Sequence, residues 1–126
     1  MLESDIEAYL VNRCKKLGVH RDKFSSPQKR NVPDDILTFR GSVIFLELKA
    51  TGKRPSEAQQ RDHWRRIEAG ACVLWTDSVE GVDIVLYSML AQRPVPYMAR
   101  MDAGGVPYKV DDGSRRVRKG RVNFGD

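Results

Sequence analysis

One apolar segment of the chain runs directly into charged residues, and it limits the possible folds more than any other stretch. Residues 43–46 read VIFL and are followed at once by Glu47, Leu48 and Lys49. Side chains of a strand alternate between the two faces of a sheet, and both faces are apolar here until Glu47. This pattern is typical of a central strand covered on both sides. A carboxylate at the end of such a strand is costly unless it meets a cation or hydrogen-bond donors.

The rest of the pattern predicts three helices and four strands in the order αβββαβα. A first helix is expected over residues 3–17, because apolar residues recur there at helical spacing and Gly18 is a suitable stop. Strands are expected over 20–24, 34–39, 42–50 and 71–76, and further helices over 56–69 and within 78–90. Arg40-Gly41 is a hairpin signal between the second and third strands. This order predicts an α/β fold, a small mixed sheet flanked by helices.

The character of the sequence changes after residue 90. Prolines, DAGG and then RRVRKGR at residues 115–121 replace the regular pattern. We expect residues 1–90 to form one domain, and residues 91–126 to form a basic extension, partly disordered, rather than a second domain. The formal net charge is +5, and residues from Arg93 onward hold eight basic and four acidic side chains. Such an excess favours polyanionic partners, nucleic acid first.

Several protein classes are disfavoured by the sequence. Cys14 and Cys72 match no metal-ligand spacing, and their apolar neighbours predict buried, reduced thiols. The N-terminal segment is acidic and lacks the apolar region of a secretory signal. No apolar run approaches the ~20 residues needed to span a bilayer. We therefore expect a soluble, cytoplasmic protein with no membrane partner.

The charged end of the apolar strand is suited to a metal ion. The preceding hairpin strand can bring Asp34 or Asp35 beside Glu47, and physical grounds alone leave both open. Two carboxylates with the Leu48 carbonyl form the oxygen cluster that Mg²⁺ or Mn²⁺ prefers. Lys49 could orient or deprotonate a water, or hold a phosphate oxygen. The structural alternative is a surface Glu–Lys pair at a fraying strand end, and the upstream Pro-Asp and the basic surroundings argue against it.

Five separated pieces of the chain occur in the order found in a known nuclease family. Pro33-Asp34 followed by Glu47-Leu48-Lys49 is similar to the PD-(D/E)xK nuclease motif, and the fuller pattern resembles its virus-type replication-repair nuclease (VRR-NUC) branch. The pieces are ESDIEAYL, KFSSP, VPDDIL, FLELKATGKRPSEAQ and DSVEGVDIVL. The resemblance covers about residues 3–90. It implies a restriction-endonuclease-like core and metal-dependent hydrolysis of DNA phosphodiesters.

The resemblance also assigns roles around the metal. It places the acidic ligands on Asp34 and Glu47, with the Leu48 carbonyl as a further ligand and Lys49 completing the motif. The implied cofactor is Mg²⁺ or Mn²⁺. One residue departs from the pattern, because the glycine usual two residues before the proline is Asn31 here. Asn tolerates left-handed backbone angles better than most residues, so we expect the turn to be kept.

The family also supplies an acidic residue from the first helix. On a wheel of about 100° per residue, Glu3 falls within the apolar arc and Glu7 lies at its edge. We choose Glu3 as the catalytic candidate and hold Glu7 in reserve. A first-turn acid that complements the helix dipole is the structural alternative.

Gln59 has two interpretations that the sequence leaves open. Ser56-x-x-Gln59 fits a capping box, whereas the resemblance makes Gln59 the active-site glutamine. His63, one helical turn later, is expected to be a partly buried structural histidine. Trp64 and Trp75 are expected in the core.

Basic residues lie in the loops on either side of the motif strands. We expect four of them to contact the phosphates of a nucleic acid: Lys29, Arg30, Lys53 and Arg54. The run at residues 115–121 reads either as a solvated tail or as an added electrostatic contact to nucleic acid.

Together these features predict a divalent-metal-dependent DNA endonuclease of phage or bacterial origin. Short standalone members of the branch look like paired nucleases, which implies a homodimer acting on branched DNA such as Holliday junctions. The alternatives are a catalytically inactive nucleic-acid-binding module, or an interaction protein whose acidic patch is incidental.

Overall fold

The computed structural model describes residues 1–25, 31–93, 95 and 97. Its helices are α1 (Glu3–Leu17), α2 (Glu57–Glu68) and α3 (Val79–Leu90), and its strands are β1 (His20–Lys23), β2 (Asp35–Phe39), β3 (Ser42–Leu48) and β4 (Cys72–Thr76). Within this part of the chain the elements follow the predicted order αβββαβα. The α/β fold class is confirmed.

The four strands form one mixed sheet in the order β1-β2-β3-β4. β2 pairs antiparallel with both β1 and β3. β3 and β4 pair parallel, and the helix α2 connects them. A two-residue loop joins β2 to β3, and both Arg40 and Gly41 have positive φ, 47° and 86°. Tight hairpins require this backbone conformation. β3 is therefore a central strand, as its apolar pattern predicted.

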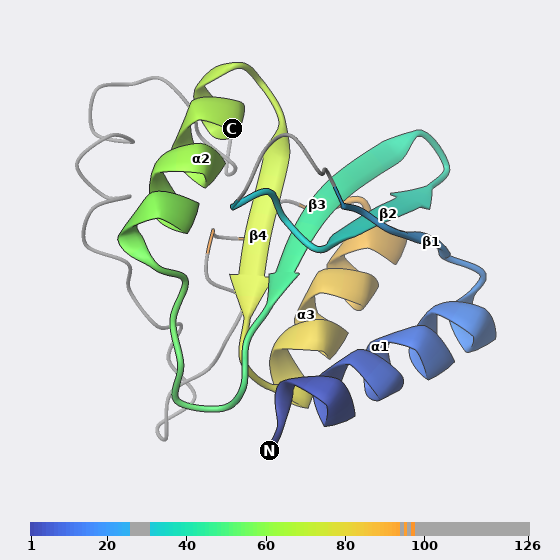
Figure 1. The fold of residues 1–126 in the computed structure, drawn as a ribbon. Helices are drawn as coiled ribbons and strands as arrows, with labels where there is room; N and C mark the ends of the chain where they lie inside the picture. The colour runs from blue at the N-terminus through green and yellow to red at the C-terminus, as the bar shows by residue number, and fades with distance from the viewer. Residues whose placement is uncertain (26–30, 94, 96, 98–126) are drawn as a thin grey trace.

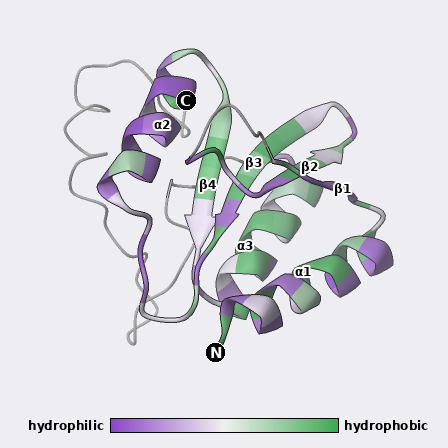
Figure 2. Cartoon of the chain, viewed as in Figure 1, coloured by the Kyte–Doolittle hydropathy of each residue, from purple (hydrophilic) through white to green (hydrophobic). Residues whose placement is uncertain are grey.

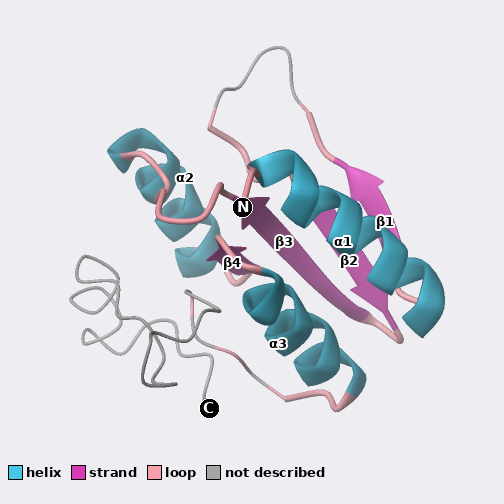
Figure 3. Ribbon diagram, turned by 90° about the horizontal axis from the view of Figure 1, so that it is seen from below, coloured by secondary structure: helices cyan, strands magenta, loops and turns pink. Residues whose placement is uncertain are grey.

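The helices cover the two faces of the sheet unequally. α1 and α3 lie together on one face, and α2 lies on the other beside β4 (Figures 1 and 3). The larger apolar cluster fills the α1/α3 face and includes Ile6, Leu10, Leu37, Leu46, Leu48 and Val85. A smaller cluster lies beneath α2. Figure 2 shows the same contrast, since α3 is largely hydrophobic and most of α2 is hydrophilic.

Local sequence signals explain where α2 begins and ends. The Ser56 side chain accepts a hydrogen bond from the Gln59 backbone amide, and the Gln59 side chain accepts one from the Ser56 backbone amide. This reciprocal capping box satisfies backbone donors that the helix leaves free. After the helix, Gly70 adopts φ 105°, which a residue with a Cβ rarely adopts. α2 thus begins and ends close to the predicted residues.

Two described residues beyond α3 belong to the packed core. Val95 and Tyr97 are each 5% exposed, and the Tyr97 carbonyl accepts a hydrogen bond from the Trp75 amide at 3.0 Å. The proposed boundary after residue 90 stays a prediction, and the basic run at 115–121 lies outside the described residues.

The remaining expectations about the core agree with the fold, except that Cys72 is less buried than expected. Trp64 and Trp75 are buried. Cys14 and Cys72 are free thiols, buried and half-buried respectively, and burial raises the pKa of each to about 11. None of the described helices is both long enough and apolar enough to cross a membrane.

Candidate active site

The β2–β3 hairpin places Asp34 beside Glu47. Asp35 pairs with Leu46, so the next position of the same register sets Asp34 opposite Glu47. Paired residues share a face of the sheet and neighbours in sequence do not. Asp35 accordingly lies on the opposite face, fully buried, with Arg21 Nε 2.7 Å from its Oδ1. Strand geometry therefore separates the two aspartates that the sequence left open.

Glu47 is the most constrained carboxylate of this cluster. It is 2% exposed, Gln59 Nε2 donates to its Oε2 at 3.3 Å, and Lys49 Nζ lies 3.5 Å from the same oxygen. Its Oε1 is buried and has no hydrogen-bond partner among the described residues. Burial and then the neighbouring Asp34 carboxylate raise the pKa of Glu47 to about 8, against the opposing effect of Lys49.

Gln59 forms the expected capping box and also contacts Glu47. Its side-chain Oε1 accepts a hydrogen bond from the Ser56 backbone amide at 2.8 Å, and its backbone amide donates one to Ser56 Oγ at 3.1 Å. Its Nε2 remains available and donates to Glu47. Because the cap fixes the amide plane of Gln59, the start of α2 orients the donor that contacts Glu47.

Comparisons with known proteins agree with this geometry. No protein-family model matches the chain. The chain is 40% identical over 77 residues to "Putative nuclease p44" of Acyrthosiphon pisum secondary endosymbiont phage 1, and the match covers 60% of this chain and 83% of that protein. A solved structure described as "VRR_NUC domain" superposes with a TM-score of 0.62 at 29% identity, covering 68% of this chain and 94% of the other. The chain belongs to the VRR-NUC family. The predicted resemblance is confirmed.

Nucleases of the VRR-NUC and PD-(D/E)xK type generally use divalent metal ions, and the donor atoms of this VRR-NUC chain fit such an ion. Glu47 offers a buried oxygen without a partner, next to the half-buried Asp34. Leu48 could contribute only its backbone carbonyl, because its side chain is a hydrocarbon, which is buried in the larger apolar cluster. Mg²⁺ is commonly held by one or two carboxylates and keeps several waters or phosphate oxygens.

The cluster is sparse in protein ligands. Among residues 1–25, 31–93, 95 and 97, no three His, Cys, Asp or Glu side chains gather closely enough to hold a metal ion. A site with two carboxylates leaves coordination positions open, and catalytic metal sites need such positions for water and substrate.

The expected inward orientation of Glu3 is wrong, because its side chain is exposed. The helical wheel places it on the apolar stripe, but Glu3 occupies the first turn, and burial on this stripe begins only at Ile6. The start of α1 nevertheless lies beside the loop after Lys49, since the Thr51 amide donates to the Met1 carbonyl at 3.0 Å. A catalytic role of Glu3 stays a prediction.

Glu7, the reserve candidate, is already engaged. Its Oε2 lies 2.8 Å from Arg21 Nη2 and 2.6 Å from Lys23 Nζ. Lys23 and then Arg21 lower the pKa of Glu7, so the carboxylate is ionised and paired. Arg21 also contacts Asp35, which places Glu7 in a network on the face of the sheet opposite to Glu47.

His63 is buried more completely than the partial burial that the sequence indicated. It is fully buried, and burial lowers its pKa to about 4, so it is neutral near pH 7. Its Nδ1 lies 2.6 Å from the hydroxyl of Tyr97. Sequence reasoning missed Tyr97, because it stands in a proline-containing stretch without helical or strand periodicity. Its aromatic character was the only signal that could have indicated burial.

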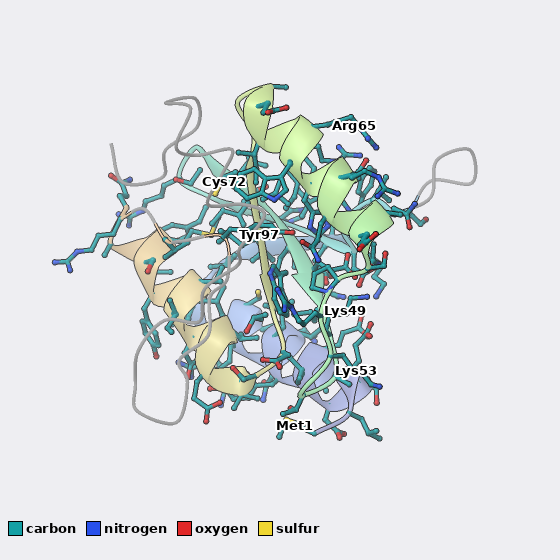
Figure 4. The ribbon with its side chains drawn as sticks, turned by 90° about the vertical axis from the view of Figure 1, so that its left-hand side faces the viewer. Met1, Lys49, Lys53, Arg65, Cys72 and Tyr97 are labelled. Carbon is teal, nitrogen blue, oxygen red and sulfur yellow. The ribbon has the colours of Figure 1, made fainter. Side chains whose placement is uncertain are left out.

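The basic residues predicted to meet phosphates are only partly described. Lys53 and Arg54 are exposed in the loop between β3 and α2, and Figure 4 shows Lys53 on the same side of the sheet as Lys49. Lys29 and Arg30 lie outside the described residues. Asn31 has φ 65°, so the left-handed turn expected before Pro33 is present with Asn in place of Gly.

Proposed function

We propose that this VRR-NUC protein is a divalent-metal-dependent DNA endonuclease in which Asp34, Glu47 and the Leu48 carbonyl hold the ion. One observation carries the proposal. The Glu47 carboxyl is 2% exposed and lies next to a second carboxyl, Asp34, an arrangement that is costly when both groups are ionised without a cation. The name "Putative nuclease p44" of the phage relative supports the same reaction class.

The proposed reaction is hydrolysis of a phosphodiester bond by in-line attack of water. A bound divalent ion supplies charge that stabilises the phosphate and lowers the pKa of a bound water. Lys49, whose ammonium lies 3.5 Å from Glu47, holds a phosphate oxygen or the attacking water. Gln59 keeps the Glu47 carboxylate in one orientation through its 3.3 Å hydrogen bond. Glu3, at the exposed start of α1 near the loop after Lys49, is a further proposed carboxylate of the site.

The proposed substrate is DNA, with branched DNA such as Holliday junctions preferred. Lys53 and Arg54 lie exposed on the loop that follows β3, and Lys29 and Arg30 flank the other motif strand in sequence. Contacts of these residues with phosphates would position a strand without reading its bases. We further propose that the protein is a homodimer, because two-fold symmetry presents two active sites to the opposite strands of a junction. We propose that it acts inside the cell.

Incubation of the protein with supercoiled, linear duplex and four-way-junction DNA tests this function. We expect cleavage with Mg²⁺ or Mn²⁺ that stops on chelation, and that is lost in Glu47→Gln and Asp34→Asn proteins that remain folded. Glu80→Gln is the matched control, since Glu80 is an exposed first-turn acid of α3. Tight binding of all substrates without cleavage would instead favour an inactive nucleic-acid-binding module. A monomeric mass in light scattering at assay concentrations would contradict the proposed homodimer.

A further inference from the structure

Tyr97 lies beyond the last helix, yet it is part of the small core beneath α2. Among the described residues, the buried members of that cluster are Trp64, Ile67, Val73, Trp75 and Tyr97. The Tyr97 ring lies 5.1 Å from Trp64 and 5.7 Å from His63, centroid to centroid. Figure 4 shows Tyr97 beside β4 and close to α2. Of these buried members, only Tyr97 lies outside α2 and β4, and aromatic side chains bury a large area each.

Both ends of the Tyr97 residue are hydrogen-bonded to elements of the site. Its hydroxyl is 2.6 Å from His63 Nδ1 on α2, and its carbonyl accepts the Trp75 amide of β4 at 3.0 Å. Trp75 is the residue that pairs with Glu47 in the parallel β3–β4 register. Tyr97 thus joins α2 to the sheet at the level of the proposed metal ligand.

The face of α2 that Tyr97 contacts is also the face that contacts Glu47. Gln59 and His63 are four residues apart, so their side chains lie on one side of the helix, one turn apart. Gln59 donates to Glu47 and His63 contacts Tyr97. A rotation or outward shift of α2 would therefore break both contacts together.

We propose that Tyr97 is a positioning residue for the catalytic face, which fixes α2 against β4 and thereby holds the Gln59 amide on Glu47. The inference rests on the proposed function for the role of Glu47, whereas the anchoring of α2 is independent of it. It gives a task to a residue outside the five pieces that identify the family. It also means that the functional unit extends at least to Tyr97.

Amide hydrogen exchange of the full-length, metal-free protein tests the anchoring without DNA. In Tyr97→Phe the ring stays and the hydroxyl is lost, so we expect exchange in α2 and at the Gln59 side-chain amide to rise about fivefold relative to α3. Tyr9→Phe is the matched control, because the Tyr9 hydroxyl bonds to Asp83 at 2.8 and 2.9 Å on the other face of the sheet. That variant should loosen α1 and α3 and leave α2 unchanged.

A double-mutant cycle tests whether Tyr97 acts through Gln59. We expect Tyr97→Phe to lower the single-turnover cleavage rate at saturating DNA about tenfold, with DNA affinity unchanged, and to weaken Mn²⁺ binding. Added to Gln59→Ala, which removes the donor itself, Tyr97→Phe should have no further effect on the rate. Tyr9→Phe should leave the rate and Mn²⁺ binding unchanged at a temperature well below its melting point.

The possible results separate cleanly. Equal exchange in α2 and α3 of Tyr97→Phe, additive losses in the cycle, or identical behaviour of Tyr97→Phe and Tyr9→Phe would overturn the inference. A wild-type protein that neither binds Mn²⁺ nor cleaves any substrate would overturn the proposed function. In that case faster exchange at the Gln59 amide in Tyr97→Phe would still support the anchoring role.

Discussion

The Glu47 carboxyl group is buried beside the Asp34 carboxylate, so its ionisation destabilises the folded protein when no cation is present. Burial and Asp34 raise the pKa of Glu47 to about 8. For an acid whose pKa is raised on folding, stability is greatest below the unfolded pKa and falls as the pH rises toward the folded value. Metal-free protein should therefore lose stability between pH 6.5 and 8, on the order of 1–2 kcal/mol from this residue.

Substitution of Glu47 by Gln should remove this loss, because the amide keeps the size of the side chain without its charge. We expect Glu47→Gln to melt at a higher temperature than the wild type at pH 8.5 in the presence of a chelator. Thermal unfolding followed by circular dichroism at pH 6.5 and 8.5 measures the difference. Glu80→Gln, at an exposed position, should match the wild type. A Glu47→Gln protein that is less stable at both pH values would contradict the prediction.

The response to metal should show the opposite pH dependence. A carboxylate must be ionised to bind a cation, so Glu47 has to release its proton on binding. The rise in melting temperature on adding Mn²⁺ should be larger at pH 8.5 than at pH 6.5, and Glu47→Gln should abolish it. An equal rise at both pH values, or a rise that survives in Glu47→Gln, would mean that the ion binds elsewhere.

Single residues also show how far sequence reasoning reached. With a two-residue loop at Arg40–Gly41, the hairpin register alone sets residue 34 opposite residue 47, so the choice of Asp34 was available before the structure. The orientation of Glu3 was not, because a helical wheel has no information on where a helix extends past the core it covers. Tyr97 could not be foreseen, since nothing in its neighbourhood indicates that the chain returns to β4.

Among the elements, α2 connects local capping chemistry to the site. Ser56 caps α2 and Ser78 caps α3. The hydroxyl of each accepts a hydrogen bond from a backbone amide, that of Gln59 and that of Gly81 respectively. Replacing either serine by Ala should cost about 1 kcal/mol of stability. Only Ser56→Ala should also lower the cleavage rate, by about 10-fold, because the lost hydroxyl accepts the Gln59 backbone amide and so holds the turn from which the Gln59 side chain reaches Glu47.

The two alanine variants form a matched pair, since they remove the same group from the same position of two helices. Melting temperatures and single-turnover rates of both, measured at one temperature below either transition, give the comparison. Equal rates in Ser56→Ala and Ser78→Ala would show that the cap of α2 has no part in orienting Gln59.

The elements themselves were largely predictable because their local signals agree with the tertiary structure. The capping box and Gly70 bracket α2, and apolar spacing gives α1 from Glu3 to Leu17. β1 and β3 end earlier than their patterns suggested, β3 at Leu48 instead of residue 50, whereas β2 and β4 begin one residue later and end as predicted. The apolar pattern of a strand does not show how far its neighbouring strand extends. Here β4 ends at Thr76, opposite Leu48, and the pairing of β3 ends there too.

At the scale of the whole molecule, the sheet and its two unequal faces follow from the order of the elements. Three strands in succession build the antiparallel part, and the single β-α-β crossover through α2 makes the last pair parallel. Among the described elements, this crossover leaves α2 as the one helix on its face of the sheet, packed on the smaller of the two apolar clusters. The contribution of Tyr97 to that cluster is a long-range contact that no local pattern encodes.

The positive charge of the chain should act on DNA affinity rather than on folding or catalysis. Five basic residues of the 115–121 run can be replaced together by Gln: Arg115, Arg116, Arg118, Lys119 and Arg121. We expect this full-length variant to melt like the wild type and to cleave saturating DNA at the same rate. Its DNA binding should be weaker and less sensitive to salt, because each lost phosphate contact lowers the slope of log K against log salt concentration by about 0.9.

Fluorescence anisotropy with a labelled four-way junction gives the DNA affinity at salt concentrations between about 50 and 200 mM, and hence that slope. Replacing Lys15 and Lys16 by Gln is the control, because both are exposed at the end of α1, on the helix layer opposite to Glu47. That control should keep the wild-type slope. If the slope of the 115–121 variant also stayed at the wild-type value, this run would make no contact with DNA, and Lys29, Arg30, Lys53 and Arg54 would have to supply the electrostatic part of binding alone.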